Sequence, residues 1–323
     1  MAKVNEDEKI FIVELYKSGR STSQIARHLQ VSPPTVSRWL HRQGVTLREP
    51  RETSTKCQLR HDAFDELTVD SAYWIGFLFA DGSVIACRGE KPRVQARISE
   101  RDRDHLTKLR AFLGSTHTIG VAPAGNFGGY ASAPSVRLSV RSDRLAQRLL
   151  SLGRYEGTIN DTLAQSRDFW RGVVDGDGSL GYLSTGYSYV ALVGSRRLLE
   201  AFLLFLRNNG LAARMTIRPD KTIFQIATAG YSAENIVSFL YRDATVALDR
   251  KAARAARIIA AKDARLNAEH ARLDQIAEWY RSGASLKLIG SRLDVSAVTI
   301  LRWMEKAGIP RRERLGGRRP ALG

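Results

Sequence analysis

The chain has 323 residues, which is long enough for two or more domains and a sizeable core. It carries 50 lysines and arginines against 33 acidic residues, and the net charge of +17 favours a polyanionic partner such as nucleic acid. No run reaches the roughly 18 apolar residues of a membrane span, and residues 1–6 lack a signal-peptide core, so we expect no membrane partner and a cytoplasmic location. The two cysteines form no metal-binding pair, which argues against structural zinc.

Residues 1–50 predict three short helices. Ser18-Gly19 ends the first, Ser21 or Thr22 can cap the second, and Ser32 can cap the third. The third helix is polar and basic on its free face, which is typical of a helix-turn-helix recognition helix in the major groove of DNA. A three-helix bundle that only binds protein would show the same apolar spacing. The residues expected to contact DNA are Thr35, Ser37, Arg38, His41 and Arg42.

The same pattern recurs near the C-terminus, in residues 263–312. Ser18-Gly19, Val31-Ser32 and Arg38-Trp39 recur in order and at the same spacing as Ser282-Gly283, Val295-Ser296 and Arg302-Trp303. We therefore expect a second helix-turn-helix module that prefers different bases, because the outer face of its third helix differs. Its expected DNA contacts are Thr299, Arg302 and Lys306.

Two further segments flank this second module. A helix from Asp249 to Trp279 is predicted to link it to the preceding part of the chain, with Lys251, Arg254 and Arg257 as a basic stripe. Residues 313–323 form a basic tail, either an arm for phosphates or plain disorder.

Two copies of one motif lie between the modules. The first is Gly76-Phe77-Leu78-Phe79-Ala80-Asp81-Gly82 and the second is Gly172-Val173-Val174-Asp175-Gly176-Asp177-Gly178. Each predicts an apolar helix that ends in an acid followed by glycine. Gly76 and Ala80, like Gly172 and Gly176, are four residues apart and share a helix face, where small residues let two backbones approach closely.

If the two motif helices pack along those faces, Asp81 and Asp177 arrive side by side. Two neighbouring carboxylates repel each other unless a cation lies between them. Mg²⁺, which takes only one or two protein carboxylates, fits that need, with Mn²⁺ as a substitute. The alternative is two buried helices that happen to end in Asp-Gly, a common turn pair.

Strands with a period of two follow each motif. Arg93–Ile98 and Val136–Arg141 alternate in polarity and predict half-buried strands, as do Ala213–Arg218 and Thr222–Thr228 in the second half. The outward side chains expected to reach DNA are Arg93, Gln95, Arg97, Arg137, Ser139, Arg141, Arg214, Thr216 and Arg218. Arginines that face outward only for solubility are the alternative.

These elements predict an α+β fold. Two pseudo-symmetric repeats of the order αββαββα occupy residues 70–156 and 157–262, after a linker over residues 51–69, with an all-α helix-turn-helix module at each end.

The two motifs resemble those of the LAGLIDADG homing endonuclease family. This resemblance implies that Asp81 and Asp177 are the metal-binding acids of an enzyme that cuts both DNA strands across the minor groove. It also implies a basic residue from a strand near each metal, for which Arg137, Arg141 and Lys221 are the candidates. Phe79 departs from the family's motif where Asp175 keeps it, and we interpret Asp175 as a local cap.

Because both repeats lie in one chain, we expect a monomer with a non-palindromic site. Neither end carries the splicing residues of an intein, which favours a free-standing enzyme encoded in an intron or a phage-like element. A transcription regulator that kept the fold but lost cleavage, and an RNA maturase, remain the alternatives.

Overall fold

The computed structural model describes residues 6–47, 57–87, 90–127, 130–153, 158–211, 217–220 and 223–312. The chain divides into two compact units, residues 1–60 with 110–118 and residues 61–109 with 119–323.

The N-terminal part is a three-helix module. Its helices are α1 (Glu6–Lys17), α2 (Thr22–His28) and α3 (Pro33–Arg42). Ser21 caps α2: its hydroxyl accepts a hydrogen bond from the backbone N–H of Gln24, whose side chain accepts from the N–H of Ser21. Buried side chains from all three helices make one core: Ile12, Tyr16, Ile25, Ala26, Val36 and Leu40. The module predicted from the apolar spacing is confirmed.

The first repeat has the predicted order of elements and one addition. Its elements are α5 (Val69–Asp81), β1 (Gly82–Cys87), β2 (Glu90–Ser99), the short helix η1 (Glu100–Asp102), α6 (Arg103–Phe112), β3 (Gly120–Ala122), β6 (Ser135–Arg141) and α7 (Asp143–Ser151). The antiparallel sheet has the order β1-β2-β6-β3. A hairpin of β4 (Gly125–Phe127) and β5 (Tyr130–Ser132), which the sequence pattern did not predict, is inserted before β6.

The second repeat copies this plan. Its elements are α8 (Asp161–Ala164), α9 (Arg167–Asp177), β7 (Gly178–Tyr182), β8 (Ser188–Gly194), α10 (Arg196–Asn208), β9 (Arg218–Asp220), β10 (Ile223–Ala229) and α11 (Tyr231–Tyr241). The sheet order β7-β8-β10-β9 matches that of the first repeat. The predicted α+β class and the repeat order are confirmed.

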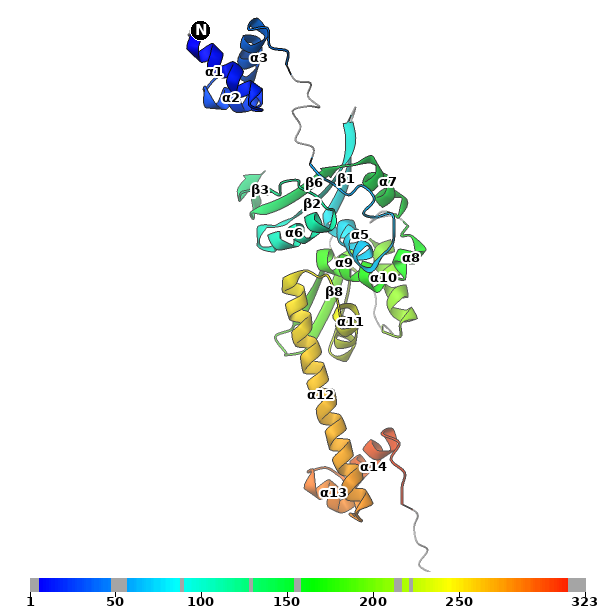
Figure 1. The fold of residues 1–323 in the computed structure, drawn as a ribbon. Helices are drawn as coiled ribbons and strands as arrows, with labels where there is room; N and C mark the ends of the chain where they lie inside the picture. The colour runs from blue at the N-terminus through cyan, green and yellow to red at the C-terminus, as the bar shows by residue number, and fades with distance from the viewer. Residues whose placement is uncertain are drawn as a thin grey trace, which may run out of the picture. The chain divides into compact units, whose positions relative to one another are not determined.

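Helices α5 and α9 lie side by side at the centre of the two repeats (Figure 1). They carry much of the core, because Trp74 and Phe77 of α5 and Phe169 and Trp170 of α9 are all buried. Part of the predicted linker over residues 51–69 packs on the first repeat. Phe64 within it is buried, and the Nε atom of Arg148 on α7 donates to its carbonyl oxygen over 3.0 Å.

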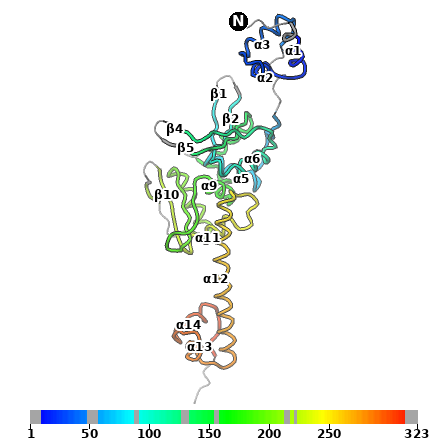
Figure 2. Tube along the Cα trace, turned by 90° about the vertical axis from the view of Figure 1, so that its left-hand side faces the viewer, coloured from blue at the N-terminus to red at the C-terminus, as the bar shows by residue number. Residues whose placement is uncertain are grey.

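The remaining helices are α12 (Asp249–Arg281), α13 (Leu286–Arg292) and α14 (Ala297–Lys306). As Figure 2 shows, α12 is one uninterrupted helix. Its last turns pack on α13 and α14 through a second small core: Ile276, Tyr280, Ile289, Ile300 and Met304. The long helix and the second module were predicted. Of the three residues of the predicted basic stripe, Arg254 and Arg257 are exposed, whereas Lys251 is buried, with only 2% of the residue exposed. Among the described helices, none is long and apolar enough to cross a membrane.

Candidate active site

Glycine residues allow the backbones of α5 and α9 to approach each other closely. A Cβ atom on Gly76 would lie 2.0 Å from the carbonyl oxygen of Phe169, and one on Gly172 would lie 2.1 Å from that of Tyr73. A Cβ atom on Gly176 would lie 2.3 Å from the Cβ atom of Ala80. At Gly76, Gly172 and Gly176, only glycine permits this approach, because any Cβ atom there would overlap the opposite helix. The four small residues singled out in the sequence therefore lie where the two helices meet.

Both helices end at the acids that the motifs singled out. Asp81 is the last residue of α5 and Asp177 the last of α9. The N–H group of Gly82 then donates back to Leu78, and that of Gly178 donates back to Val174. The two turns thus have the same local structure, and each is followed directly by the first strand of its own sheet.

The two carboxyl groups influence one another. The pKa of Asp81 is raised to about 6, first by burial and next by the negative charge of Asp177, while Lys251 and Arg250 oppose the rise. A carboxyl pair with this behaviour favours a bound cation. In the described part of the chain no three His, Cys, Asp or Glu side chains cluster as a metal site. Water and phosphate oxygens would have to complete the coordination of a metal bound by the pair, as Mg²⁺ commonly allows.

Asp175 is not the local cap that we expected. Its carboxylate accepts hydrogen bonds of 2.7 Å from the hydroxyl of Tyr73 on α5, the hydroxyl of Tyr241 on α11 and the N–H of Leu248 at the start of α12. Burial raises the pKa of Asp175, and these donors oppose the rise. The residue ties four helices together beneath the carboxylate pair.

This network continues to His105 on α6. The Nε2 atom of His105 lies 3.0 Å from the hydroxyl oxygen of Tyr73, which already donates its proton to Asp175. Nε2 of His105 must then carry a proton, while Nδ1 is buried without a hydrogen-bond partner. Burial lowers the pKa of His105 to about 3, since a charged ring would place an unpaired N–H group among Trp74 and Phe77.

Lys251 lies beneath the end of α9, and sequence reasoning missed this role. Its Nζ atom donates to the carbonyl oxygens of Val174, Asp175 and Gly178 over 2.6–2.7 Å, and reaches that of Gly176 at 3.4 Å. Burial lowers its pKa to about 8. The available signal was periodicity: Ala255 and Ile258, four and seven residues later, are buried, so Lys251 occupies the apolar face of α12.

The outward side chains predicted on the first sheet face one another across β2 and β6. The register pairs Arg93 with Arg141, Gln95 with Ser139, and Arg97 with Arg137. Their neighbours Val94, Ala96 and Ile98 on β2 are buried, as expected from the alternation. Like charges directly opposite each other destabilise a sheet. A polyanion lying along this face would offset that cost.

The other sheet candidates are less fully described. Arg137 and Arg141, two of the candidates for the basic catalytic group, are exposed on β6. Arg218 is exposed at the start of β9, where it pairs with Gln225. Lys221, Arg214 and Thr216 lie outside the described residues.

The helix-turn-helix candidates lie on α3 and α14. Arg38, His41 and Arg42 are exposed, while Thr35 and Ser37 are half-buried. On α14, Arg302 and Lys306 are exposed and Thr299 is half-buried. Thr35 and Thr299 are equivalent in a further respect, since each hydroxyl lies within 2.9 Å of the serine hydroxyl that precedes its helix. The two modules are therefore alike in build.

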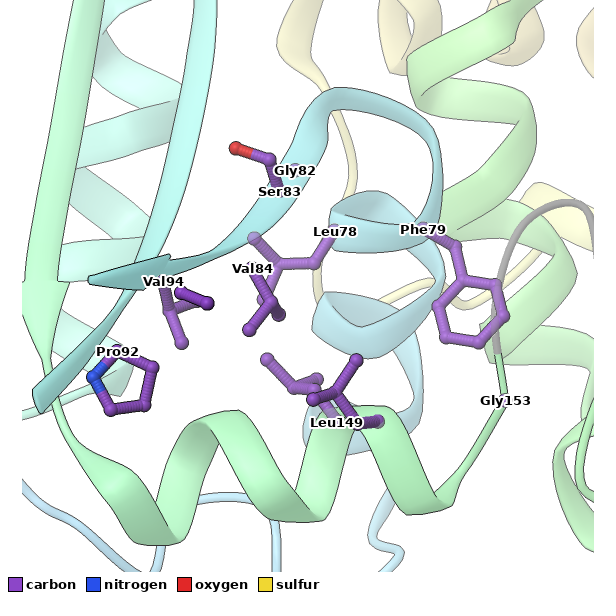
Figure 3. A pocket seen from close by; sticks show the side chains of 11 residues that line it. Leu78, Phe79, Gly82, Ser83, Val84, Pro92, Val94, Leu149 and Gly153 are labelled. Carbon is purple, nitrogen blue, oxygen red and sulfur yellow. The ribbon is translucent and has the colours of Figure 1, made fainter. Parts of the chain in front are cut away.

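A cavity of about 390 Å³ lies beside the end of α5 (Figure 3). It is bounded by Val84 of β1, Val94 of β2 and Leu149 of α7, on the side of the sheet away from the arginines. Among the described residues, those that line it carry no ionisable side chain.

Three solved structures illustrate what this chain is similar to. The homing endonuclease I-WcaI bound to its DNA recognition sequence matches at 12% identity over 59% of this chain and 90% of its own, with a TM-score of 0.45. The LAGLIDADG meganuclease I-AabMI bound to uncleaved DNA matches at 13% identity over 63% and 93%, with a TM-score of 0.43. The I-LtrWI LAGLIDADG homing endonuclease bound to target DNA matches at 11% identity over 63% of this chain and 93% of its own, with a TM-score of 0.41. This is the family that the two motifs resemble.

A family model for a homeodomain-like domain matches residues 3–45, which contain α1, α2 and α3. Among curated proteins, none matches the chain. Because the identities and TM-scores of the solved structures are low, we base the function on this chain's own residues.

Proposed function

We propose that this protein is a sequence-specific double-strand DNA endonuclease that hydrolyses phosphodiester bonds with a divalent metal held by Asp81 and Asp177. One observation carries the proposal. Two helices in glycine contact each end in an acid, and the negative charge of Asp177 raises the pKa of Asp81 further than burial alone. Two neighbouring carboxylates repel each other and so destabilise the fold, whereas a cation bound between them would remove that repulsion.

The donor set suits a hard cation such as Mg²⁺, with Mn²⁺ as a substitute. The pair offers two carboxylate groups, and no histidine or cysteine joins them in a cluster among the described residues. A bound metal would supply a water of lowered pKa for attack and would stabilise the departing 3′ oxygen. One acid from each repeat matches one cut in each strand of a duplex.

Affinity for DNA would come from the first sheet and from the two end modules. The arginine pairs of β2 and β6 suit phosphate contacts, and Gln95 and Ser139 between them suit base edges. Helices α3 and α14 would each place a short basic surface in a major groove. Their outer faces differ at His41 and Glu305, which occupy the same position, so the modules would read different bases.

A DNA-binding regulator without cleavage is the second candidate, because both end modules have helix-turn-helix geometry. Such a protein would have no use for the pairing of Asp81 with Asp177. An RNA maturase fits the end modules less well, since the deep major groove of RNA does not admit a helix.

The test is incubation of the purified chain with a randomised duplex library, in Mg²⁺ and in a chelator, followed by sequencing of bound and cut molecules. We expect cuts in both strands at one long asymmetric site in Mg²⁺ and none in the chelator. A bound motif without cuts in Mg²⁺ or Mn²⁺ would assign the protein to the regulators instead.

A further inference from the structure

The outward face of the second sheet carries no charged side chain on strands β7, β8 and β10. The inward face of these strands is marked by Leu180, Leu192 and Ile226, which are buried and paired in register. Side chains that alternate with them point outward. They are Ser179, Tyr189, Ala191, Val193, Ile223, Gln225, Ala227 and Ala229. Apart from Ser179 and Gln225, these outward residues are aliphatic or aromatic.

The matching positions of the first sheet are charged or polar. Gly82 pairs with Ala96 in the first repeat and Gly178 pairs with Leu192 in the second, so the two registers correspond strand by strand. The counterparts of Arg93, Arg97, Arg137 and Arg141 are, in that order, Tyr189, Val193, Gln225 and Ala229. Those of Gln95 and Ser139 are Ala191 and Ala227. Every arginine of the first face thus corresponds to an uncharged residue in the second.

The uncharged face is accessible and shallow. Its exposed members are Ser179, Ile223, Ala227 and Ala229. The ring of Tyr189 lies along the sheet, because a Cβ atom on Gly181 of β7 would be 3.4 Å from it. Arg218 of the edge strand β9 lies opposite Gln225 and is exposed, so a cation borders this face at its margin. A partner can therefore approach the alkyl groups of the face closely.

The chemistry of this face suits one kind of base pair. Phosphate contacts need cations or hydrogen-bond donors, and alkyl groups provide neither. In the major groove the C5-methyl group of thymine is the apolar feature of a base edge, and a glutamine amide can pair with N6 and N7 of adenine. Val193 and Ala227 offer methyl groups for the first contact, and Gln225 offers an amide for the second. Both contacts belong to A·T pairs.

We propose that the second repeat selects an A·T-rich half-site, chiefly by contact of its uncharged face with thymine methyl groups. Cytosine in place of thymine loses the methyl group and presents an amino group to alkyl side chains, which offer it no acceptor. The arginines of the first repeat make no such demand, because phosphate contacts carry no sequence information directly. This inference rests on the duplex binding of the proposed function and specifies the substrate of that function.

The experiment uses the full chain and a randomised duplex library, with selection by binding in Ca²⁺. The wild type is compared with Val193→Ala and with Arg97→Ala, which changes the matching position of the first sheet. The base preferences that each variant relaxes identify the half-site beneath its repeat. In the selected duplex, deoxyuridine then replaces thymine in one half-site at a time. This exchange removes the methyl group and keeps the base pair, and fluorescence anisotropy measures the affinity.

We expect A·T pairs to dominate the half-site whose preference Val193→Ala relaxes. Deoxyuridine there should weaken binding by roughly fourfold for each contacted methyl group, the value of one buried methylene. This factor should be the same at low and high salt, because a methyl contact releases no counterion. Deoxyuridine in the other half-site should change the affinity little. Val193→Ala should reduce the penalty in its own half-site, whereas Arg97→Ala should leave that penalty unchanged.

Equal deoxyuridine penalties in the two half-sites, or none in either, would overturn the inference, and this comparison on the wild type does not require either variant to fold. A G·C-rich half-site beneath the second repeat would overturn it too. So would a folded Val193→Ala variant with unaltered base preferences, which would favour a protein partner for this face. A chain that shows the A·T bias in Ca²⁺ but never cuts in Mg²⁺ would overturn the proposed nuclease and support this inference, so the two failures are distinct.

Discussion

The two repeats share one fold and one motif, yet their sheets present different outward faces. In the first repeat, Arg97 lies opposite Arg137, and Arg93 opposite Arg141. At the matching register of the second repeat, Val193 lies opposite Gln225, and Tyr189 opposite Ala229. Among the described strand pairs, arginines face each other in the first repeat and not in the second, so under the proposed function the first sheet would supply more of the phosphate contacts.

The two repeats also differ in what lies against the end of the motif helix and the first strand of the sheet. In the first repeat, Leu78, Gly82 and Val84 border an apolar cavity. The residues in the same places of the second repeat are Val174, Gly178 and Leu180, and their carbonyl groups accept hydrogen bonds from Lys251 and Arg254 of α12. The second repeat is therefore supported from within by α12, while the first is open there. The two repeats therefore differ in two respects: paired arginines lie on the sheet of the first repeat, and hydrogen bonds from α12 support the second.

The feature that both repeats share should be the most sensitive to change. Gly172→Ala would place a Cβ atom 2.1 Å from a carbonyl oxygen of α5, where neither backbone can yield. We expect the free energy of unfolding, measured by urea denaturation, to fall by about 3 kcal/mol or more.

The matched control is Gly181→Ala, whose new Cβ atom would have its nearest neighbour at 3.4 Å, on the ring of Tyr189. It should change the free energy of unfolding by less than about 1 kcal/mol. Equal losses in the two variants would mean that the glycine contact between the helices is not the common support.

His105, on α6 of the first repeat, should make the free energy of unfolding depend on pH. The pKa of His105 is about 3 in the folded chain, and the ordinary value of 6.5 applies in the unfolded chain. The unfolded chain therefore takes up a proton below pH 6.5 that the folded chain refuses. The contribution is complete above that pH and declines as pH falls towards 3, by about 2 kcal/mol between pH 7 and pH 5.

Urea unfolding of His105→Phe at both pH values should show a flatter dependence than that of the wild type. Asp81, whose raised pKa acts with the opposite sign, is present in both proteins and cancels in the difference. Parallel dependences would show that His105 takes up its proton in the folded state.

The end modules should contribute separately to DNA affinity. Arg38→Ala and Arg302→Ala remove equivalent exposed arginines from α3 and α14. Each should weaken binding to the selected duplex by about 1–3 kcal/mol and relax the preference at a different base position. Fluorescence anisotropy in Ca²⁺ measures the affinity, and a library selection gives the positions. Loss of preference at the same bases in both variants would contradict independent reading.

The smallest expected effect concerns the sheet faces. Arg97→Ala removes one member of an arginine pair, whereas Gln225→Ala changes a residue at the matching register of the second repeat. A plot of log affinity against log salt concentration should lose about one unit of slope for the arginine variant. The glutamine variant should keep the wild-type slope. Equal slopes in all three proteins would remove the charge distinction between the sheets.

The sequence predicted the features that repeat with a local period. Alternation over two residues located β2 and β6 and the six outward side chains, and the Gly-x-x-x-Ala and Gly-x-x-x-Gly spacings located the helix contact. The β4–β5 hairpin was missed because its two three-residue strands are too short to show a period.

The role of Asp175 could not be predicted in the same way. Its hydroxyl partners Tyr73 and Tyr241 lie 102 and 66 residues away in the chain, beyond any local pattern. Lys251 was within reach, since its spacing to Ala255 and Ile258 places it on the buried face of α12. A basic residue on an apolar face was interpreted as part of a stripe, when it indicated a buried partner.

Under the proposed function, Asp81 and Asp177, one acid from each repeat, act together in a single paired centre. The most direct test of this pairing compares the wild type with Asp81→Asn and Asp177→Asn on the selected duplex, measuring affinity in Ca²⁺ and the cutting of each strand in Mg²⁺. We predict that either substitution abolishes double-strand cutting while binding persists, because the amide keeps the shape of the site and loses the charge. Double-strand cutting at the wild-type rate by either variant would contradict the paired centre.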